Sequence, residues 1–182
     1  MSVPEAPLRT TKFGLAPDGE GWFVLNAKDS RWRDDGTSLG FYTDFEGKRR
    51  FPQLGVSLYV LHRGEAMSMY HRERHQEAFL VLAGECLLIV EGEERTLRAW
   101  DFFHCPGETA HTIVGAGDGP AVVFACGARG GARGYFYPTD PAAAAHGAAA
   151  DRDTTEPADA YARFPASTRC RFREEWFDRH DA

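Results

Sequence analysis

The chain has 182 residues, 43% of them hydrophobic and 13% aromatic, which is enough for one domain with a sizeable core plus extensions. Its formal net charge is −6, and no basic stripe offsets it, so we expect no nucleic-acid partner. No apolar run approaches the roughly 18 residues of a membrane span, and residues 1–20 lack the apolar stretch of a signal peptide. Four widely spaced cysteines without a CxxC pair favour reduced thiols in a cytoplasmic protein over a zinc finger.

Residues 1–50 are predicted to form an N-terminal arm, with a short strand at residues 21–26. Residues 51–137 alternate short apolar or β-branched runs with turn signals such as Glu91-Gly92-Glu93. This pattern predicts a sandwich or a closed barrel. The expected strands lie at residues 56–61, 67–73, 78–83, 86–90, 95–99, 100–104, 111–114 and 121–126.

Residues 138–182 change character and are predicted to form a C-terminal helical extension and tail. Thr139-Asp140-Pro141 precedes an alanine-rich run, as at the capped start of a helix with proline in its first turn. A second short helix is expected from Pro157 to Phe164, and residues 169–182 form a charged and aromatic tail. We expect these helices to pack on the barrel or on a partner.

The most informative stretch runs from residue 71 to residue 77, where His71, Glu73, His75 and Glu77 occupy the odd positions. In an extended strand, successive side chains point to opposite faces, so these four would share one face. Imidazole and carboxylate together are the ligand set of zinc, iron, manganese and nickel sites. A histidine from a distant strand would complete such a site.

Two motifs in this region resemble those of the cupin family. From Gly64 through His71, Glu73 and Glu77 to Gly84, the chain is similar to the first cupin motif, with one extra residue after the glycine and glutamate at the second histidine position. Pro106 followed five residues later by His111 is similar to the second motif. The resemblance covers roughly residues 55–127. It implies an all-β fold, the cupin double-stranded β-helix or jelly-roll barrel, with an N-terminal arm and short C-terminal helices.

The resemblance further implies one divalent metal ion (Fe, Mn, Ni or Zn) held by His71, Glu73, Glu77 and His111. His75 is the rival of Glu73: it is a ligand if the strand stays extended, and otherwise a proton-transfer group or a partner of the ligands at the barrel mouth. Strand alternation predicts an apolar pocket around the ion. Its lining would be Met67, Met69, Phe79, Val81 and Ile113.

Three functions remain open at this point. The first is a metal-dependent enzyme, either an oxygenase or an isomerase or lyase, acting on a small organic molecule in the barrel. The second is a non-catalytic cupin that binds a small molecule or a metal as a sensor or carrier. The third is a metal-free sugar-nucleotide epimerase, which needs a histidine base facing a tyrosine acid. The resemblance also implies a homodimer; the catalytic residues cannot be assigned from the sequence.

Overall fold

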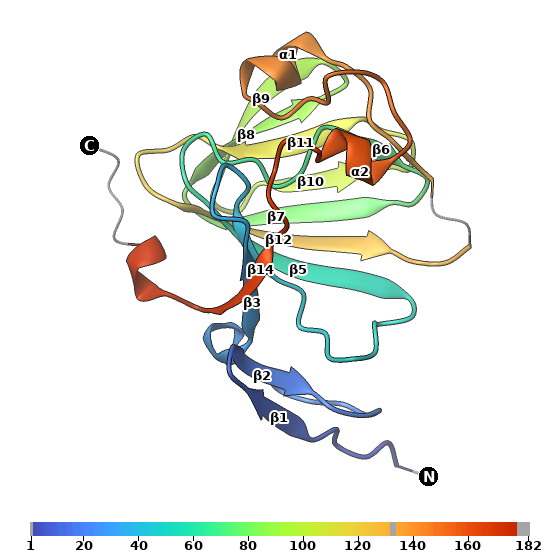
Figure 1. The fold of residues 1–182 in the computed structure, drawn as a ribbon, viewed down its shortest axis with the longest axis vertical. Coiled ribbons are helices and arrows are strands. Elements are labelled where there is room, and N and C mark those ends of the chain that lie inside the picture. Colours follow the sequence, from blue (N-terminus) through green and yellow to red (C-terminus); the bar gives the residue numbers. More distant parts are fainter. Residues whose placement is uncertain (1, 132–133, 178–182) are drawn as a thin grey trace.

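The computed structural model describes residues 2–131 and 134–177, so the last part of the predicted tail, residues 178–182, lies outside the described residues (Figure 1). The strands are β1 (Leu8–Thr11), β2 (Gly14–Pro17), β3 (Arg31–Asp34), β4 (Phe41–Thr43), β5 (Leu54–Leu61), β6 (Arg72–Glu73), β7 (Glu77–Ala83), β8 (Glu85–Val90), β9 (Glu93–Arg98), β10 (Phe102–Cys105), β11 (His111–Gly115), β12 (Ala121–Ala128), β13 (Tyr135–Phe136) and β14 (Thr168–Arg171). The helices are α1 (Pro141–Ala145), α2 (Pro157–Ala160) and the 3-10 helices η1 (Ala27–Asp29) and η2 (Glu174–Trp176).

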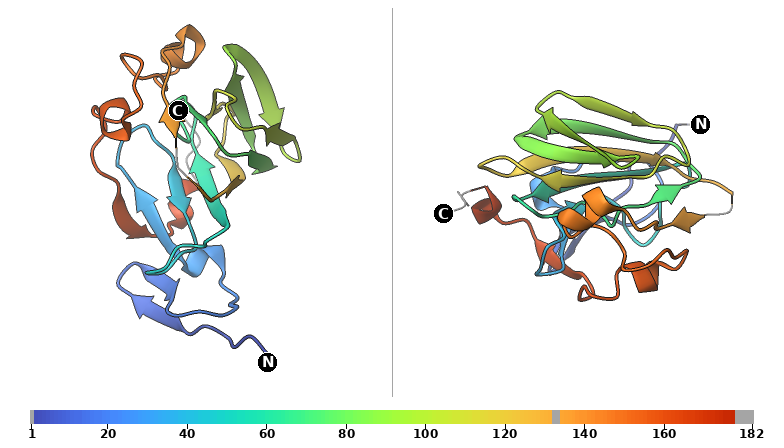
Figure 2. Two further views of the ribbon diagram at one scale, coloured as in Figure 1. Left: turned by 90° about the vertical axis from the view of Figure 1, so that its right-hand side faces the viewer. Right: turned by 90° about the horizontal axis from the view of Figure 1, so that it is seen from above.

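Two antiparallel sheets face each other around the core. The larger sheet has seven strands in the order β10-β7-β12-β5-β4-β3-β14, and the smaller has three in the order β11-β8-β9. Figure 2 shows the two layers of strands from above. The predicted all-β barrel with short C-terminal helices is confirmed. Between the sheets lies an apolar cluster that includes Leu61, Phe79, Val81, Leu88 and Ile113, all almost fully buried.

Several barrel strands form at short apolar runs, in which alternate side chains are buried more deeply. In β7, Phe79 and Val81 point into the core and are at most 2% exposed, while their neighbours are less buried. The turn into β8 is made by Gly84, whose φ of +72° is costly for any residue with a side chain. A Cβ atom at Gly84 would lie 2.4 Å from the carbonyl oxygen of Pro120, so this turn also requires the close approach that only glycine allows.

Part of the predicted N-terminal arm belongs to the barrel sheet. β1 and β2 form a separate hairpin, which extends away from the barrel (Figure 1). β3 and β4, in contrast, extend the large sheet beyond β5. The strand predicted at residues 21–26 is wrong: Trp22 forms only a single bridge to Glu5, and the side chain of Asn26 accepts a hydrogen bond from the amide of Lys28 to cap η1. The cap and the positive φ of Gly21 interrupt a run that looks apolar enough for a strand.

The C-terminal extension returns to both ends of the barrel. α1 begins as predicted, with Pro141 in its first turn and the Asp140 side chain accepting a hydrogen bond from the Ala143 amide at 2.9 Å. β14 then pairs with β3 at the far edge of the large sheet, where Trp32 packs on Trp176 with ring centroids 5.2 Å apart. No helix in residues 2–131 or 134–177 combines the length and the apolar character needed to cross a membrane.

Candidate metal centre

Two chain segments that lie side by side bring His71 and His111 together. His111 begins β11 in the small sheet, and His71 lies just before β6. The two residues form an antiparallel bridge, in which the His111 amide donates to the His71 carbonyl at 2.8 Å and the His71 amide donates to the His111 carbonyl at 3.2 Å. Their rings lie 5.2 Å apart, centroid to centroid. The backbone therefore fixes the separation of the two imidazoles.

Each imidazole is also oriented through its Nδ1 atom. Nδ1 of His71 lies 2.8 Å from the carbonyl oxygen of Met69, and Nδ1 of His111 lies 3.0 Å from that of Thr109. Since a carbonyl oxygen can only accept, each Nδ1 carries a proton and donates it. In the neutral ring, Nε2 is then the free lone pair, which is how metal-binding histidines are commonly prepared.

Glu77, the first residue of β7, completes the cluster. Its Oε2 atom lies 3.3 Å from Nε2 of His111 and is buried without a hydrogen bond of good geometry. One ligand atom each from His71, Glu77 and His111 can be chosen so that all lie within 4.8 Å of one another. A buried carboxylate oxygen facing two imidazole nitrogens is costly unless a cation, either a protonated imidazole or a metal ion, lies beside it. A divalent ion at this point would remove that cost, so these residues fit a metal.

The two histidines differ in acidity. Burial, reinforced by the neighbouring His111, lowers the pKa of His71 below its ordinary value of 6.5. Burial also acts to lower the pKa of His111, but the Cys105 sulfur 3.3 Å from Nδ1 and the Glu77 carboxylate 3.3 Å from Nε2 outweigh it and raise this pKa to about 10. Around neutral pH without a metal, His71 is therefore neutral, and His111 holds a proton that it shares with Glu77.

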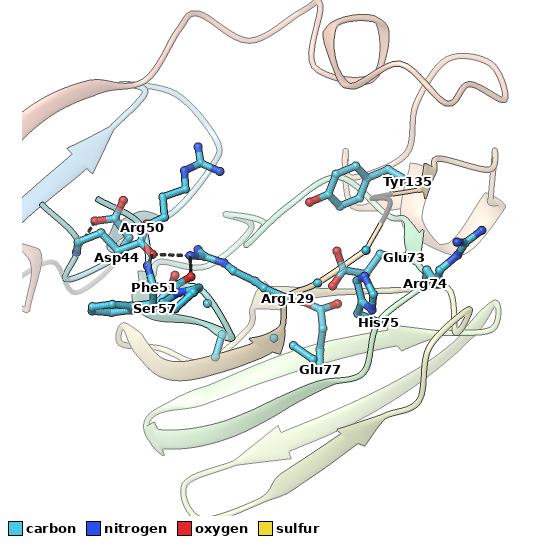
Figure 3. Close-up of a pocket in the computed structure, with 18 of the residues that line it drawn as sticks. Asp44, Arg50, Phe51, Ser57, Glu73, Arg74, His75, Glu77, Arg129 and Tyr135 are labelled. Atoms are coloured by element: carbon cyan, nitrogen blue, oxygen red, sulfur yellow. Dashed lines mark hydrogen bonds and ion pairs between the residues drawn. The ribbon is translucent and has the colours of Figure 1, made fainter. Parts of the chain in front are cut away.

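Glu73 and His75, the two alternative ligands, lie beside the cluster. Both line the same cavity as Glu77, and Figure 3 shows the three side chains next to one another. A Cβ atom added at Gly127 would lie 3.5 Å from Oε1 of Glu77 and 3.8 Å from Oε1 of Glu73, so both carboxylates face this glycine. Nε2 of His75 is buried without a hydrogen-bond partner. Neither residue belongs to the compact cluster of His71, Glu77 and His111.

A cavity of about 620 Å³ opens onto Glu77. This volume suits a small organic molecule. Its walls mix charged and aromatic groups, among them Arg50, Tyr59 and Tyr135. Across from the cluster, Arg129 forms an ion pair with the buried carboxylate of Glu46 and donates to the carbonyl of Phe51 at 2.8 Å (Figure 3). These contacts attach residues 44–53 to the end of β12, so this loop forms one wall of the cavity.

The five residues that alternation predicted around the ion lie in three places. Met67 lines the cavity. Phe79, Val81 and Ile113 lie in the closed core between the sheets, where Phe79 packs 5.2 Å from the ring of His111. Met69 is fully buried outside the barrel, in a cluster with Tyr137 and the C-terminal segment. Alternation fails at Met69 because residues 67–70 do not form a strand.

Several groups around the centre have no signal in the sequence pattern. Cys105, at the end of β10, places its sulfur 3.3 Å from Nδ1 of His111. Tyr135 and Tyr137 place their rings 6.0 and 5.6 Å from that of His71. Arg129 reaches the cavity from the end of β12. The one usable signal is the spacing of Tyr135 and Tyr137, because residues two apart lie on the same face of a strand.

Comparison with known proteins agrees with this geometry. The fold and the cluster define a double-stranded β-barrel protein with a candidate metal site, and a family model described as the cupin domain matches residues 57–126. Residues 57–126, which form the barrel, are therefore similar to the cupin domain. No curated protein matches the sequence.

Solved structures share the fold at low sequence identity. A proposed sugar phosphate isomerase from Acidithiobacillus ferrooxidans is 23% identical, with a TM-score of 0.48 over 54% of this chain and 64% of that one. A sugar phosphate isomerase from Silicibacter pomeroyi is 26% identical, with a TM-score of 0.46 over 48% of this chain and 58% of that one. The polyketide cyclase RemF from Streptomyces resistomycificus is 11% identical, with a TM-score of 0.51 over 59% of this chain and 79% of that one. The chain thus spans less than two thirds of the two isomerases, and these likenesses concern the fold alone.

Proposed function

We propose that this protein is a metal-dependent enzyme, an oxygenase or an isomerase or lyase, that acts on a small organic molecule bound in the cavity over Glu77. The observation that carries the proposal is the arrangement of His71, Glu77 and His111, whose ligand atoms lie within 4.8 Å of one another. Both histidines are held by backbone carbonyls through Nδ1, which leaves Nε2 for the ion. Two histidines and one carboxylate are the set that leaves open positions on Fe(II), although manganese, nickel and zinc accept the same ligands.

In this proposal the residues of the chain have distinct tasks. His71, Glu77 and His111 hold the ion, which supplies Lewis-acid polarisation of a substrate oxygen or, as iron, activation of dioxygen. Glu73 is the candidate fourth ligand because its carboxylate faces Gly127 beside that of Glu77. His75 is the alternative, and as a non-ligand it can take or give a proton, since its buried Nε2 has no hydrogen-bond partner. The walls around Met67 and Tyr59 exclude water from one side of the substrate.

Metal analysis of untagged protein tests whether His71, Glu77 and His111 bind a metal ion. We expect near-stoichiometric metal in the wild type and at least a tenfold lower metal affinity in His111→Ala and Glu77→Gln, because each removes one of three ligands. His104→Ala is the matched control, since His104 is exposed on β10 and outside the cluster. Equal, substoichiometric metal in all four proteins would refute the metal site. Comparison of Glu73→Gln with His75→Ala then shows which of the two completes the ligand set.

Turnover separates the enzyme from its alternatives. Metal-dependent conversion or oxygen consumption with a panel of small organic substrates supports the enzyme. Tight binding without turnover supports the non-catalytic sensor or carrier. Tyr135 and His75 line the same cavity, which is the observation that keeps a metal-free acid–base reaction as the second candidate. That candidate predicts turnover that survives chelation and is lost in Tyr135→Phe.

The remaining expectations concern the setting of the protein. The cysteines Cys86, Cys105, Cys126 and Cys170 are all free thiols, which supports a reducing, cytoplasmic location. We also propose that the protein forms a homodimer.

A further inference from the structure

A second cavity, of about 360 Å³, lies against the first. Tyr42, Tyr59 and Met67 line both cavities, which therefore adjoin along these residues. Tyr42 on β4 and Tyr59 on β5 are register partners, and their rings stack with centroids 5.3 Å apart and planes 24° apart. The large sheet therefore continues from the proposed metal chamber into this second chamber, with the stacked aromatic pair along the junction.

The opposite wall comes from the segment after α2. Tyr161 and Phe164 line the chamber, with ring centroids 6.2 Å apart and planes tilted by 57°. The Tyr161 hydroxyl accepts a hydrogen bond from the Met69 amide at 3.1 Å. This bond ties the wall to the loop that carries His71, so the chamber is preorganised rather than formed by a loose tail.

The four rings leave apolar surface open to the chamber. Tyr42, Tyr59, Tyr161 and Phe164 are each only partly buried, although they pack in two pairs, Tyr42 with Tyr59 and Tyr161 with Phe164. Apolar surface in a concave site is favourable to cover, and aromatic faces favour offset-stacked and edge-to-face partners. We propose that this second chamber is a subsite for a flat aromatic ring that belongs to the same small molecule whose polar end lies at Glu77. The link between this ring and a molecule bound at Glu77 rests on the proposed function, but binding of the ring itself needs no metal.

Charge around the chamber favours a neutral ring over a cation. Aromatic walls can also bind quaternary ammonium groups, but the Arg33 guanidinium lines the chamber and lies 6.0 Å from the Tyr42 ring centroid. The carboxylate of Asp35, which also lines it, accepts hydrogen bonds from the amide and hydroxyl of Thr37. The Asp35 carboxylate is thus hydrogen-bonded within its own loop, and the Arg33 guanidinium repels a cationic ligand.

Calorimetric titration of metal-free protein with two probes of similar size tests the proposal. The probes are 2-naphthol and its saturated analogue decahydro-2-naphthol, which share a hydroxyl and differ in flatness and aromaticity. We expect 2-naphthol to bind at least tenfold more tightly. Ala166→Trp, which fills the chamber from its C-terminal wall, and Phe164→Leu, which removes one ring, should each weaken 2-naphthol at least fivefold, with His104→Ala as the control.

The possible failures are distinguishable. Equal affinity for the two probes, unchanged 2-naphthol binding in both folded chamber variants, or displacement by tetramethylammonium would each overturn the aromatic subsite. Circular dichroism verifies that the variants fold. His111→Ala should lose metal and keep 2-naphthol binding, whereas Ala166→Trp should keep metal and lose 2-naphthol. A failed metal site therefore leaves the subsite standing, and a failed subsite leaves the metal site standing.

Discussion

His111 carries the acid–base character of the centre, and its protonation links metal binding to pH. Its pKa is raised to about 10, so it is protonated below that pH in the metal-free protein, while His71 has a lowered pKa and is already neutral at pH 7. A metal must displace the proton from Nε2 of His111. We expect metal binding at pH 7.5 to release about one proton, and metal affinity to rise about tenfold per pH unit between pH 7 and 9. Calorimetry in buffers of different ionisation enthalpy measures the proton count, and zero release would contradict this assignment.

Glycine at position 84 is required for two separate reasons, which a pair of variants can separate. Gly84 and Gly64 have similar positive φ values, +72° and +79°, but a Cβ at Gly84 would lie 2.4 Å from a backbone oxygen, and one at Gly64 would meet nothing within 4 Å. We expect Gly64→Ala to lower the free energy of unfolding by about 1 kcal/mol through strain alone. Gly84→Ala should cost about 3 kcal/mol because the backbone must also move. Urea denaturation measures both, and equal losses would show that the clash is relieved at no cost.

Individual residues differ in how far the sequence could place them. The grouping of His71, Glu77 and His111 was predictable only through the resemblance to the two cupin motifs, because His71 and His111 lie far apart in the sequence. The sequence could not decide whether Glu73 or His75 is the fourth ligand, because the answer depends on how the chain turns between β6 and β7. Cys105 approaches His111 from another strand. Such contacts depend on tertiary packing, which a local sequence pattern does not predict.

At the scale of elements, the loop between β4 and β5 depends on one buried ion pair. Glu46 is only 7% exposed. Its carboxylate forms an ion pair with Arg129 and accepts a hydrogen bond from the Phe51 amide at 2.7 Å. We expect Glu46→Gln to cost about 3 kcal/mol, since it leaves a partly buried guanidinium without its countercharge. The exposed pair between Glu20 and Arg49 is the control, and Glu20→Gln should cost less than 1 kcal/mol in the same denaturation experiment. Equal costs would mean that the buried pair has no special role.

The predicted strands of the barrel agree with the observed ones to within two residues from β5 to β12, with one exception, because turn residues such as Gly84 and Gly92 separate the short runs. The exception is the run predicted at residues 67–73, of which only β6 at Arg72–Glu73 is a strand. There the chain is held by isolated bridges and by hydrogen bonds with distant side chains, such as the bond that the Met69 amide donates to the Tyr161 hydroxyl. An extended run in sequence does not reveal whether a partner strand exists.

At the scale of the whole molecule, the outer surface near β10 bears on the predicted homodimer. Trp100 and Phe102 are 77% and 63% exposed, and Leu82 on neighbouring β7 is 38% exposed. β10 is also an edge strand of the large sheet. An apolar patch at an open sheet edge is a typical association surface. If the dimer forms there, Phe102→Glu should shift the mass measured by light scattering from dimer to monomer, whereas Val24→Glu, at an exposed apolar residue in the N-terminal segment, should not. A dimer that persists in Phe102→Glu would exclude this surface.

The pairing of β3 with β14 has a consequence for synthesis in the cell. These strands join residues 31–34 to residues 168–171, and the Trp32–Trp176 contact seals the same edge. The large sheet therefore cannot be completed on the ribosome until residues 168–171 have emerged, and until then Trp32 and Phe41 lack their cover by Cys170 and Trp176. Long-range pairings of this kind slow folding and expose aggregation-prone intermediates. Nascent chains stalled before residue 168 should thus depend more on chaperones than the finished protein does.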